Sequence, residues 1–183
     1  MVDCELLTGN IGTCDDKPFL GFTKRFIIGN LSEVNTITYS ATPNIVTGIT
    51  LKDSKHAYSL TVKSNKPFDE YKVVGVDGKV GMTFKSDLTL WIKGLNPTTS
   101  AILKILSGGS FWGTLEQKGD SVEGTFPLLG IQGGLQASAA EWNEAEGAYS
   151  VVLTEEKGDE ASWFWYNTNV ATTRAAIEGL LSA

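Results

Sequence analysis

Apolar and polar residues alternate along most of this chain, in short runs separated by polar or glycine-containing turns. Thr36–Ser40 alternates residue by residue, which is the period of a half-buried strand. The apolar residues of Lys79–Lys93 share one face of a pleat: Met82, Phe84, Leu88, Leu90 and Ile92. The pattern predicts eleven strands, over Lys24–Ile28, Thr36–Ser40, Ile45–Leu51, Ala57–Val62, Val73–Val76, Lys79–Lys93, Phe111–Gln117, Ser121–Leu129, Gly134–Ala140, Ala148–Thr154 and Ala161–Tyr166. Asp77-Gly78 predicts a hairpin turn before the long strand, since both positions tolerate positive φ.

A helix is predicted near the middle of the chain, over about 97–107. Asn96 is a suitable N-cap and Pro97 a suitable first residue, because the missing proline N–H is not needed at that position. Its predicted buried face has helical spacing: Ala101, Ile102, Ile105 and Leu106. A shorter helix is expected over Thr172–Leu181, with Thr172 or Thr173 as its cap.

The composition fits one folded domain. The 183 residues are 42% hydrophobic and 20% charged, which is too apolar for a disordered chain. We therefore expect a mainly β fold, a β-sandwich or β-barrel with one central helix and a short C-terminal helix. Residues 1–183 are assigned to a single β-rich domain, with residues 1–20 as a candidate extended N-terminal arm.

The charge pattern argues against several classes of partner. Fifteen basic and 21 acidic side chains give a net charge of −6, and no cluster of Lys and Arg provides the basic patch of a nucleic-acid-binding domain. No run reaches the ~18 apolar residues of a membrane helix. The N-terminus lacks the basic and apolar regions of a secretion signal, so none is expected.

The two cysteines, Cys4 and Cys14, do not define a site by themselves. A disulfide between them would close a small loop and would not persist in a reducing cytoplasm. Two thiols without a neighbouring histidine also make a poor zinc site. Free structural thiols are the favoured interpretation, while a disulfide formed outside the cell and a metal shared between subunits stay open.

No catalytic, cofactor or metal site is predicted, and the chain is expected not to be an enzyme. His56 is the only histidine. A triad of His56 with Asp53 and Ser54 or Ser59 is disfavoured, because the sequence has no Gly-x-Ser-x-Gly motif and His56 is better interpreted as a surface residue. Pairs of acidic residues are interpreted as solvated turns: Asp15-Asp16, Glu155-Glu156 and Asp159-Glu160. The loop from Glu155 to Glu160 lacks the spacing of an EF-hand.

The run Trp163-Phe164-Trp165-Tyr166 is the most aromatic stretch of the chain. In a strand its residues point alternately to opposite faces, so both faces need a cover. The C-terminal helix, a neighbouring subunit and a stacked ligand are the three alternatives. Because Trp and Tyr are enriched at interfaces, we take Trp163, Trp165 and Tyr166 as a candidate subunit interface.

Several segments together resemble small virion proteins of tailed phages that infect Bacteroidetes. The resemblance spans most of the chain but is loose, and it is carried by turn glycines and core positions. The matching residues are Cys4-x-x-Leu7-Thr8-Gly9, Cys14-x-Asp16, Ile37-Thr38-Tyr39, Val46-Thr47-Gly48-Ile49-Thr50, Tyr58, Leu128-Leu129-Gly130-Ile131-Gln132-Gly133-Gly134-Leu135, Ala137-Ser138-Ala139 and Gly147-x-Tyr149-x-x-x-Leu153-Thr154.

Such proteins are similar in architecture to phage tail-tube subunits, whose rings stack around a DNA channel. The resemblance implies a virion structural subunit, a tail-tube or tail-ring protein, assembled in the host cytoplasm. Its partners would be copies of itself and other virion proteins, with passive contact to DNA and no specific nucleic-acid readout. The Lys79–Lys93 strand would be a candidate for the channel wall, and a negative charge would suit a lumen through which DNA slides.

Two other functions fit the same pattern. A capsid-associated or decoration protein would have a similar β-rich fold. A carbohydrate-binding β-sandwich module could use Trp112, Trp163 or Trp165 as a stacking platform.

Overall fold

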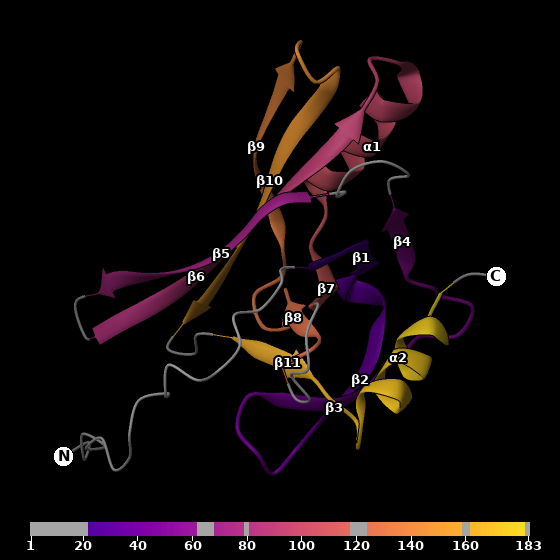
Figure 1. Cartoon of the computed structure of the whole chain (residues 1–183), viewed down its shortest axis with the longest axis vertical. Coiled ribbons are helices and arrows are strands. Elements are labelled where there is room, and N and C mark those ends of the chain that lie inside the picture. The colour runs from indigo at the N-terminus through magenta and orange to yellow at the C-terminus, as the bar shows by residue number, and fades with distance from the viewer. Residues whose placement is uncertain (1–21, 62–67, 79–80, 118–123, 159–161, 182–183) are drawn as a thin grey trace.

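The computed structural model describes residues 22–61, 68–78, 81–117, 124–158 and 162–181 (Figure 1). The candidate N-terminal arm and both cysteines lie outside the described residues. The described chain is mainly β, with two sheets and two helices, as the sequence predicts for a β-sandwich.

The larger sheet has seven strands in the order β2-β3-β11-β8-β7-β1-β4. Its strands are β1 (Phe22–Asn30), β2 (Val34–Tyr39), β3 (Ile45–Leu51), β4 (Tyr58–Thr61), β7 (Phe111–Gln117), β8 (Pro127–Leu129) and β11 (Trp163–Trp165). All neighbouring strands are antiparallel except β3 and β11, which run parallel. A short 3₁₀ helix, η1 (Leu31–Glu33), joins β1 to β2.

The smaller sheet has four antiparallel strands in the order β5-β6-β10-β9. Its strands are β5 (Phe68–Gly78), β6 (Gly81–Lys93), β9 (Gln136–Asn143) and β10 (Ala148–Gly158). Two hairpins therefore form this sheet, β5–β6 and β9–β10, and they extend in opposite directions from the body of the molecule (Figure 1).

Two helices complete the fold. The first, α1 (Pro97–Gly108), begins as predicted, with the Asn96 side chain accepting a hydrogen bond from the Thr99 backbone N–H at 2.9 Å. The second, α2 (Val170–Glu178), is capped by Asn169, whose side chain accepts from the Thr172 N–H at 2.8 Å. The prediction that Thr172 or Thr173 caps this helix was therefore wrong, because the helix begins earlier and Asn169 is its N-cap.

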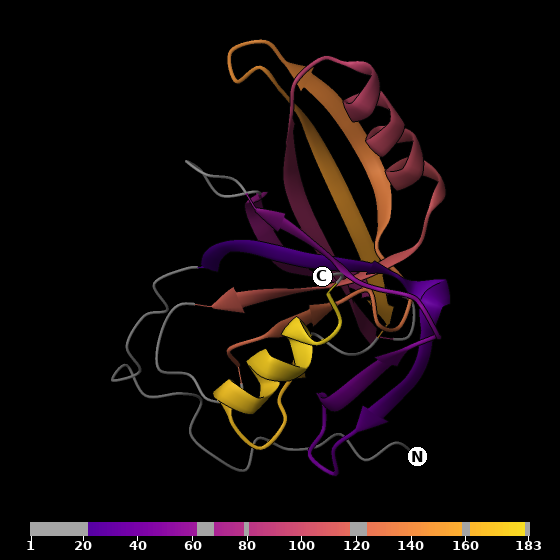
Figure 2. The same cartoon turned by 90° about the vertical axis from the view of Figure 1, so that its right-hand side faces the viewer.

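The hydrophobic core has two parts, one on each face of the seven-stranded sheet. One part lies between the two sheets and under α1, and it includes Phe26, Leu90, Leu106 and Leu153. The other lies between the seven-stranded sheet and α2, around Trp112 and other apolar side chains. Figure 2 shows the resulting layers, with β1 and β7 between the four-stranded sheet and α2.

Three local predictions were wrong in position. Asp77 pairs with Met82 and Gly78 with Gly81, so both residues belong to the strand ladder and do not form the predicted turn. The strand predicted to end at Thr154 continues to Gly158, still paired with β6. Of the predicted strand Ser121–Leu129, only Pro127–Leu129 forms a strand, while residues 118–123 lie outside the described residues.

The buried face of α1 also differs from the prediction. Leu106 is buried, but Ile102 and Ile105 are 39% and 62% exposed. Thr99 is buried in place of the predicted Ala101, which is exposed. The helix is thus rotated relative to the sheet, so that part of its apolar stripe faces outward.

Candidate functional site

The two edge strands of the four-stranded sheet, β5 and β9, are candidate contacts with another chain. Among the described residues, β5 pairs only with β6, and β9 pairs only with β10. An edge strand presents unpaired backbone N–H and C=O groups, which are a template for pairing with another chain. β9 contains the small, exposed residues Ser138, Ala139 and Ala140, and helix α1 packs beside this strand (Figure 2).

The outer face of this sheet carries lysines and carboxylates beside the exposed apolar side chains of Val74 and Val76. The strand register places the buried Leu88 and Leu90 on the inner face, so the alternate positions face outward. The charged side chains that the structure describes on the outer face are Lys72, Lys85 and Lys93 together with Glu70, Asp87 and Glu141. Lys72 pairs with Glu70 at 3.7 Å and Lys85 with Asp87 at 3.4 Å.

A row of hydroxyl groups joins the strands on this outer face. Thr154 in β10 donates a hydrogen bond to Asp87 of β6 at 2.7 Å and lies 2.9 Å from the hydroxyl of Ser138 in β9. The three residues therefore link three neighbouring strands. The outer face is thus held in place by cross-strand polar contacts as well as by the backbone ladder.

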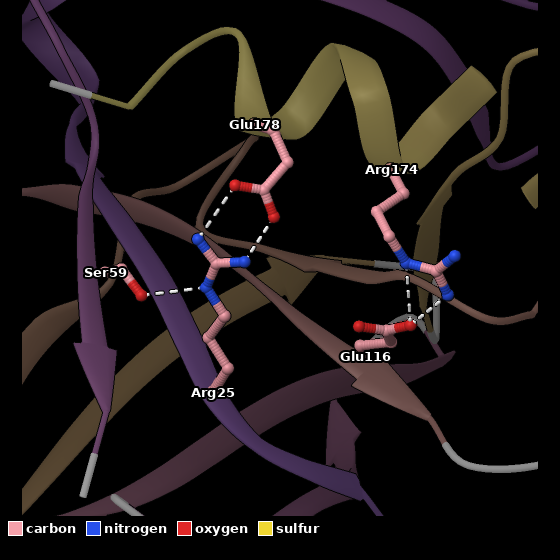
Figure 3. A network of polar contacts seen from close by, with 5 residues as sticks. All are labelled: Arg25, Ser59, Glu116, Arg174 and Glu178. Atoms are coloured by element: carbon pink, nitrogen blue, oxygen red, sulfur yellow. Dashed lines mark hydrogen bonds and ion pairs between the residues drawn. The ribbon is translucent and has the colours of Figure 1, made fainter. Parts of the chain in front are cut away.

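The C-terminal helix is fixed to the seven-stranded sheet by two ion pairs (Figure 3). Arg25 of β1 makes a bidentate contact with the Glu178 carboxylate. Its Nε–H also donates a hydrogen bond to the Ser59 hydroxyl at 2.8 Å. Arg174 pairs with Glu116 of β7. Because bidentate Arg–carboxylate contacts are directional, the Arg25–Glu178 pair defines where the end of α2 sits on the sheet.

The Arg25–Glu178 pair predicts a small dependence of stability on pH. The hydrogen bonds from Arg25 hold the pKa of Glu178 below its usual value of 4.5. The stabilising contribution of this ion pair is therefore complete above a pH of 4.5, and it is lost as the pH falls through the lowered pKa of Glu178. We expect Glu178→Gln to lower the free energy of unfolding by less than about 1 kcal/mol near neutral pH, because both side chains are partly exposed.

Urea unfolding of wild type and Glu178→Gln, at neutral pH and in strong acid, measures this difference, which should vanish in acid. Glu144→Gln is the matched control, since Glu144 is exposed and its carboxylate has no partner among the described residues. Equal stabilities of wild type and Glu178→Gln at neutral pH would contradict a stabilising pair.

A cleft of about 780 Å³ lies beside α1, between the helix, strands β1 and β4, and the end of β6. Its lining is almost wholly apolar and includes Ile28, Leu60, Ile92, Ile105 and Phe111. The partly exposed Ile102 lines it too, so the apolar side of α1 that does not pack on the sheet forms one of its walls.

No family model, curated protein or solved structure matches this chain.

Among the described residues, His56 makes no hydrogen bond or ion pair with Asp53, Ser54 or Ser59, the partners considered for it from the sequence. His56 is exposed between the turn at Asp53-Ser54 and strand β4. Of the three residues, the Ser59 hydroxyl is already used in another contact, since it accepts a hydrogen bond from Arg25. Among the described residues, no group of three or more His, Cys, Asp or Glu side chains could hold a metal ion. No helix in the described part of the chain is long and apolar enough to span a membrane.

The candidate interface residues Trp163, Trp165 and Tyr166 lie in or next to β11, and they do not form one surface. Trp165 is only 1% exposed and packs edge-to-face on Trp112 in the core under α2, so it offers a partner no surface. Trp163 is half-buried against Tyr39, with ring centroids 5.3 Å apart. Tyr166 is also half-buried and donates to the Thr168 carbonyl. The C-terminal helix is thus the cover of Trp165.

This packing also bears on the carbohydrate-binding alternative. Trp112 and Trp165 are 0% and 1% exposed, so neither can stack on a sugar. Trp163 is the remaining candidate platform of the three, and its ring is already in contact with Tyr39.

A buried polar cluster was missed by sequence reasoning. Glu155, expected in a solvated loop, is 1% exposed and lies in β10, where its Oε1 accepts from the Gln132 N–H at 3.5 Å. Tyr71 lies close by and interacts with Ser86 and Ser162, and burial raises the pKa of its phenol. The alternation of Val151 and Leu153, continued by two residues, would have placed Glu155 inside.

Proposed function

We propose that this chain is a structural subunit of a tailed-phage virion, a tail-tube or tail-ring protein that assembles with copies of itself into rings around a DNA channel. The observation that carries the proposal is the four-stranded sheet, whose outermost strands, β5 and β9, have no second strand partner among the described residues. The loose resemblance of the sequence to virion proteins points the same way.

The two open edges favour a ring over a two-fold dimer. Strands β5 and β9 lie on opposite sides of one sheet, so pairing β9 of one copy with β5 of the next is a head-to-tail contact. Contacts of that kind form closed rings when the rotation between copies closes. A ring of sheets joined in this way has no free edge, which removes the aggregation hazard of an open sheet.

The outer face of the sheet suits a channel wall. Among the side chains that the structure describes, this face carries three lysines and three carboxylates, and two of the lysines pair with a neighbouring carboxylate on the same strand. Proteins hold DNA through uncompensated Lys and Arg contacts to phosphate. A wall with balanced charge would let DNA pass without holding it.

Blocking the β9 edge tests the proposal. Lysine on an edge strand opposes edge-to-edge pairing. We therefore expect Ala139→Lys to shift the protein from oligomer to monomer in sedimentation-velocity centrifugation, at a concentration where wild type is assembled. Ala139 is exposed and lies opposite Val152, which in turn lies opposite Thr89 of β6.

Thr89→Lys is the matched control, because it adds the same charge to the same row of the outer face on an inner strand. It should leave assembly unchanged. If both lysine variants assemble like wild type, the β9 edge is not a subunit contact.

A further inference from the structure

An open trough of about 850 Å³ lies on the outer face of the four-stranded sheet, at the end where β9 turns into β10. Its volume lies within the range of roughly 300–1,000 Å³ that small-molecule sites occupy. Strands that pair edge to edge extend a sheet in its own plane, so the proposed subunit contacts leave this face uncovered. The residues that shape the trough are Trp91 of β6, Ser150 of β10, Glu141 and Asn143 of β9, and Glu144 of the turn.

The strand register explains the shape of this trough. Ser150 lies directly opposite Trp91 on one side and Glu141 on the other, so the three side chains form one row across the outer face. Neighbouring strands are about 4.8 Å apart, which separates the backbones of Trp91 and Glu141 by roughly 10 Å. The small serine is therefore the floor of the trough, and the two larger side chains are its walls. Asn143 lies on the same face, two residues beyond Glu141.

Trp91 provides the apolar wall. It is half-buried, so part of its indole is open to solvent at the trough. Trp142 also borders the trough, but it lies opposite Tyr149 in a row of the inner face, and its ring packs edge-to-face on that tyrosine. An indole surface beside polar groups favours a ligand that has a flat apolar side and a polar periphery.

The other side chains offer hydrogen-bond acceptors and donors next to one another. Glu141 and Glu144 are exposed, and their carboxylates have no hydrogen-bond or ion-pair partner among the described residues. The Asn143 Oδ1 accepts from the Glu146 N–H at 3.2 Å, which leaves the side-chain N–H groups of Asn143 as donors. The Ser150 hydroxyl can donate and accept. The trough therefore presents both kinds of group around one indole.

This combination selects the class of ligand. Among the described residues that line the trough there are two carboxylates and no lysine or arginine, which disfavours anions; Lys93 lies on the same face but one row further along, opposite Ala148. An alkyl chain would leave the polar groups of the lining without partners. An organic cation would use the indole and the carboxylates but not the amide and hydroxyl donors. A sugar uses all of them, because each of its hydroxyls donates and accepts while its ring C–H groups pack on the indole.

We propose that this trough binds a neutral saccharide. One sugar ring packs on the Trp91 indole, and its hydroxyls meet the Glu141 and Glu144 carboxylates, the Asn143 amide and the Ser150 hydroxyl. The sequence did not single out Trp91 for this role, because its pattern does not show which tryptophan lies beside a hollow. This inference does not rest on the proposed function, since the face is open in the monomer as well.

Isothermal titration calorimetry of the full chain tests the proposal with a set of neutral oligosaccharides: cellotetraose, maltotetraose, mannotetraose and N-acetylated chitotetraose. At least one of them should bind, with one site per chain. Tetragalacturonate, which has a carboxylate on every ring, should bind about five-fold more weakly or less than the best neutral saccharide, because Glu141 and Glu144 repel it. Choline, a small organic cation, should not compete with the saccharide.

Two variants locate the site. Trp91→Ala should weaken the best saccharide by about ten-fold, because the apolar contact with the ring is lost, while Trp91→Tyr keeps an aromatic surface and should retain most of the affinity. Glu141→Ala should weaken it by about five-fold through the loss of a charged acceptor. Trp142→Ala and Glu70→Ala are the matched controls, since the Trp142 ring packs on the inner face and Glu70 is an exposed carboxylate on β5, outside the trough. Both should bind like wild type.

Circular dichroism establishes that each variant is folded. Failure of wild type to bind any of these neutral saccharides would overturn the proposal, as would binding that Trp91→Ala and Glu141→Ala both leave intact. Loss of binding in Trp142→Ala alone would place the site elsewhere, and choline or tetragalacturonate that binds as tightly as the best neutral saccharide would show that the class of ligand is wrong. Rings without saccharide binding contradict this inference alone, whereas a strict monomer that binds saccharide contradicts only the proposed function.

Discussion

Replacing Gly130 by alanine should lower the free energy of unfolding by about 3 kcal/mol or more. Gly130 has φ of +72°, and an added Cβ would lie 2.1 Å from the Phe111 carbonyl oxygen and 2.9 Å from the Leu135 nitrogen. Those two residues exchange backbone hydrogen bonds of 2.7 and 3.0 Å. The alanine side chain therefore cannot be placed without separating this bridge.

Gly147→Ala is the matched control for this effect. Gly147 also has a positive φ, +59°, but an added Cβ there would have no neighbour within 4 Å. We expect a loss of only about 1 kcal/mol, which is the conformational cost of a left-handed alanine. Urea unfolding of both variants gives the comparison, and equal losses would show that the close approach at Gly130 does not constrain the fold.

Trp112→Ala should destabilise the protein by about 4 kcal/mol, as large-to-small changes in a core do. Trp112 is 0% exposed and lies 6.2 Å from Trp165, centroid to centroid, in the core beneath α2. Its removal leaves a cavity between the seven-stranded sheet and the helix. The same urea titration measures the loss.

Trp142→Ala provides the comparison at the surface. Trp142 is 39% exposed at the end of β9 and makes an edge-to-face contact with Tyr149 at 5.0 Å. Its loss should cost about 1 kcal/mol. A Trp142→Ala variant as unstable as Trp112→Ala would mean that the β9–β10 hairpin, and not the core under α2, limits stability.

The strand and helix inventory could be predicted because it depends on local patterns. Ile45–Leu51 and Phe111–Gln117 form strands with the predicted bounds, and α1 starts at the predicted Pro97. The order of strands in the two sheets could not be predicted, since it depends on long-range pairing. The parallel contact of β11 with β3, for example, brings Trp165 next to Val46, far apart in the sequence.

The cleft could not be predicted because helical spacing does not say which side of an apolar stripe meets the sheet. Ile102 and Ile105 share that stripe with Leu106, yet only Leu106 is buried. Likewise, charge alone suggested a solvated Glu155, while the register of β10 turns it inward. In both places tertiary packing selected the face, and that information lies outside the local sequence.

Negative-stain electron microscopy of the purified chain tests the central claim, self-assembly into rings, most directly. We expect closed rings, or stacks of rings, with an opening at the centre, and we expect Ala139→Lys to abolish them. A protein that remains a dispersed monomer at high concentration, with no rings or tubes in any field, would contradict it.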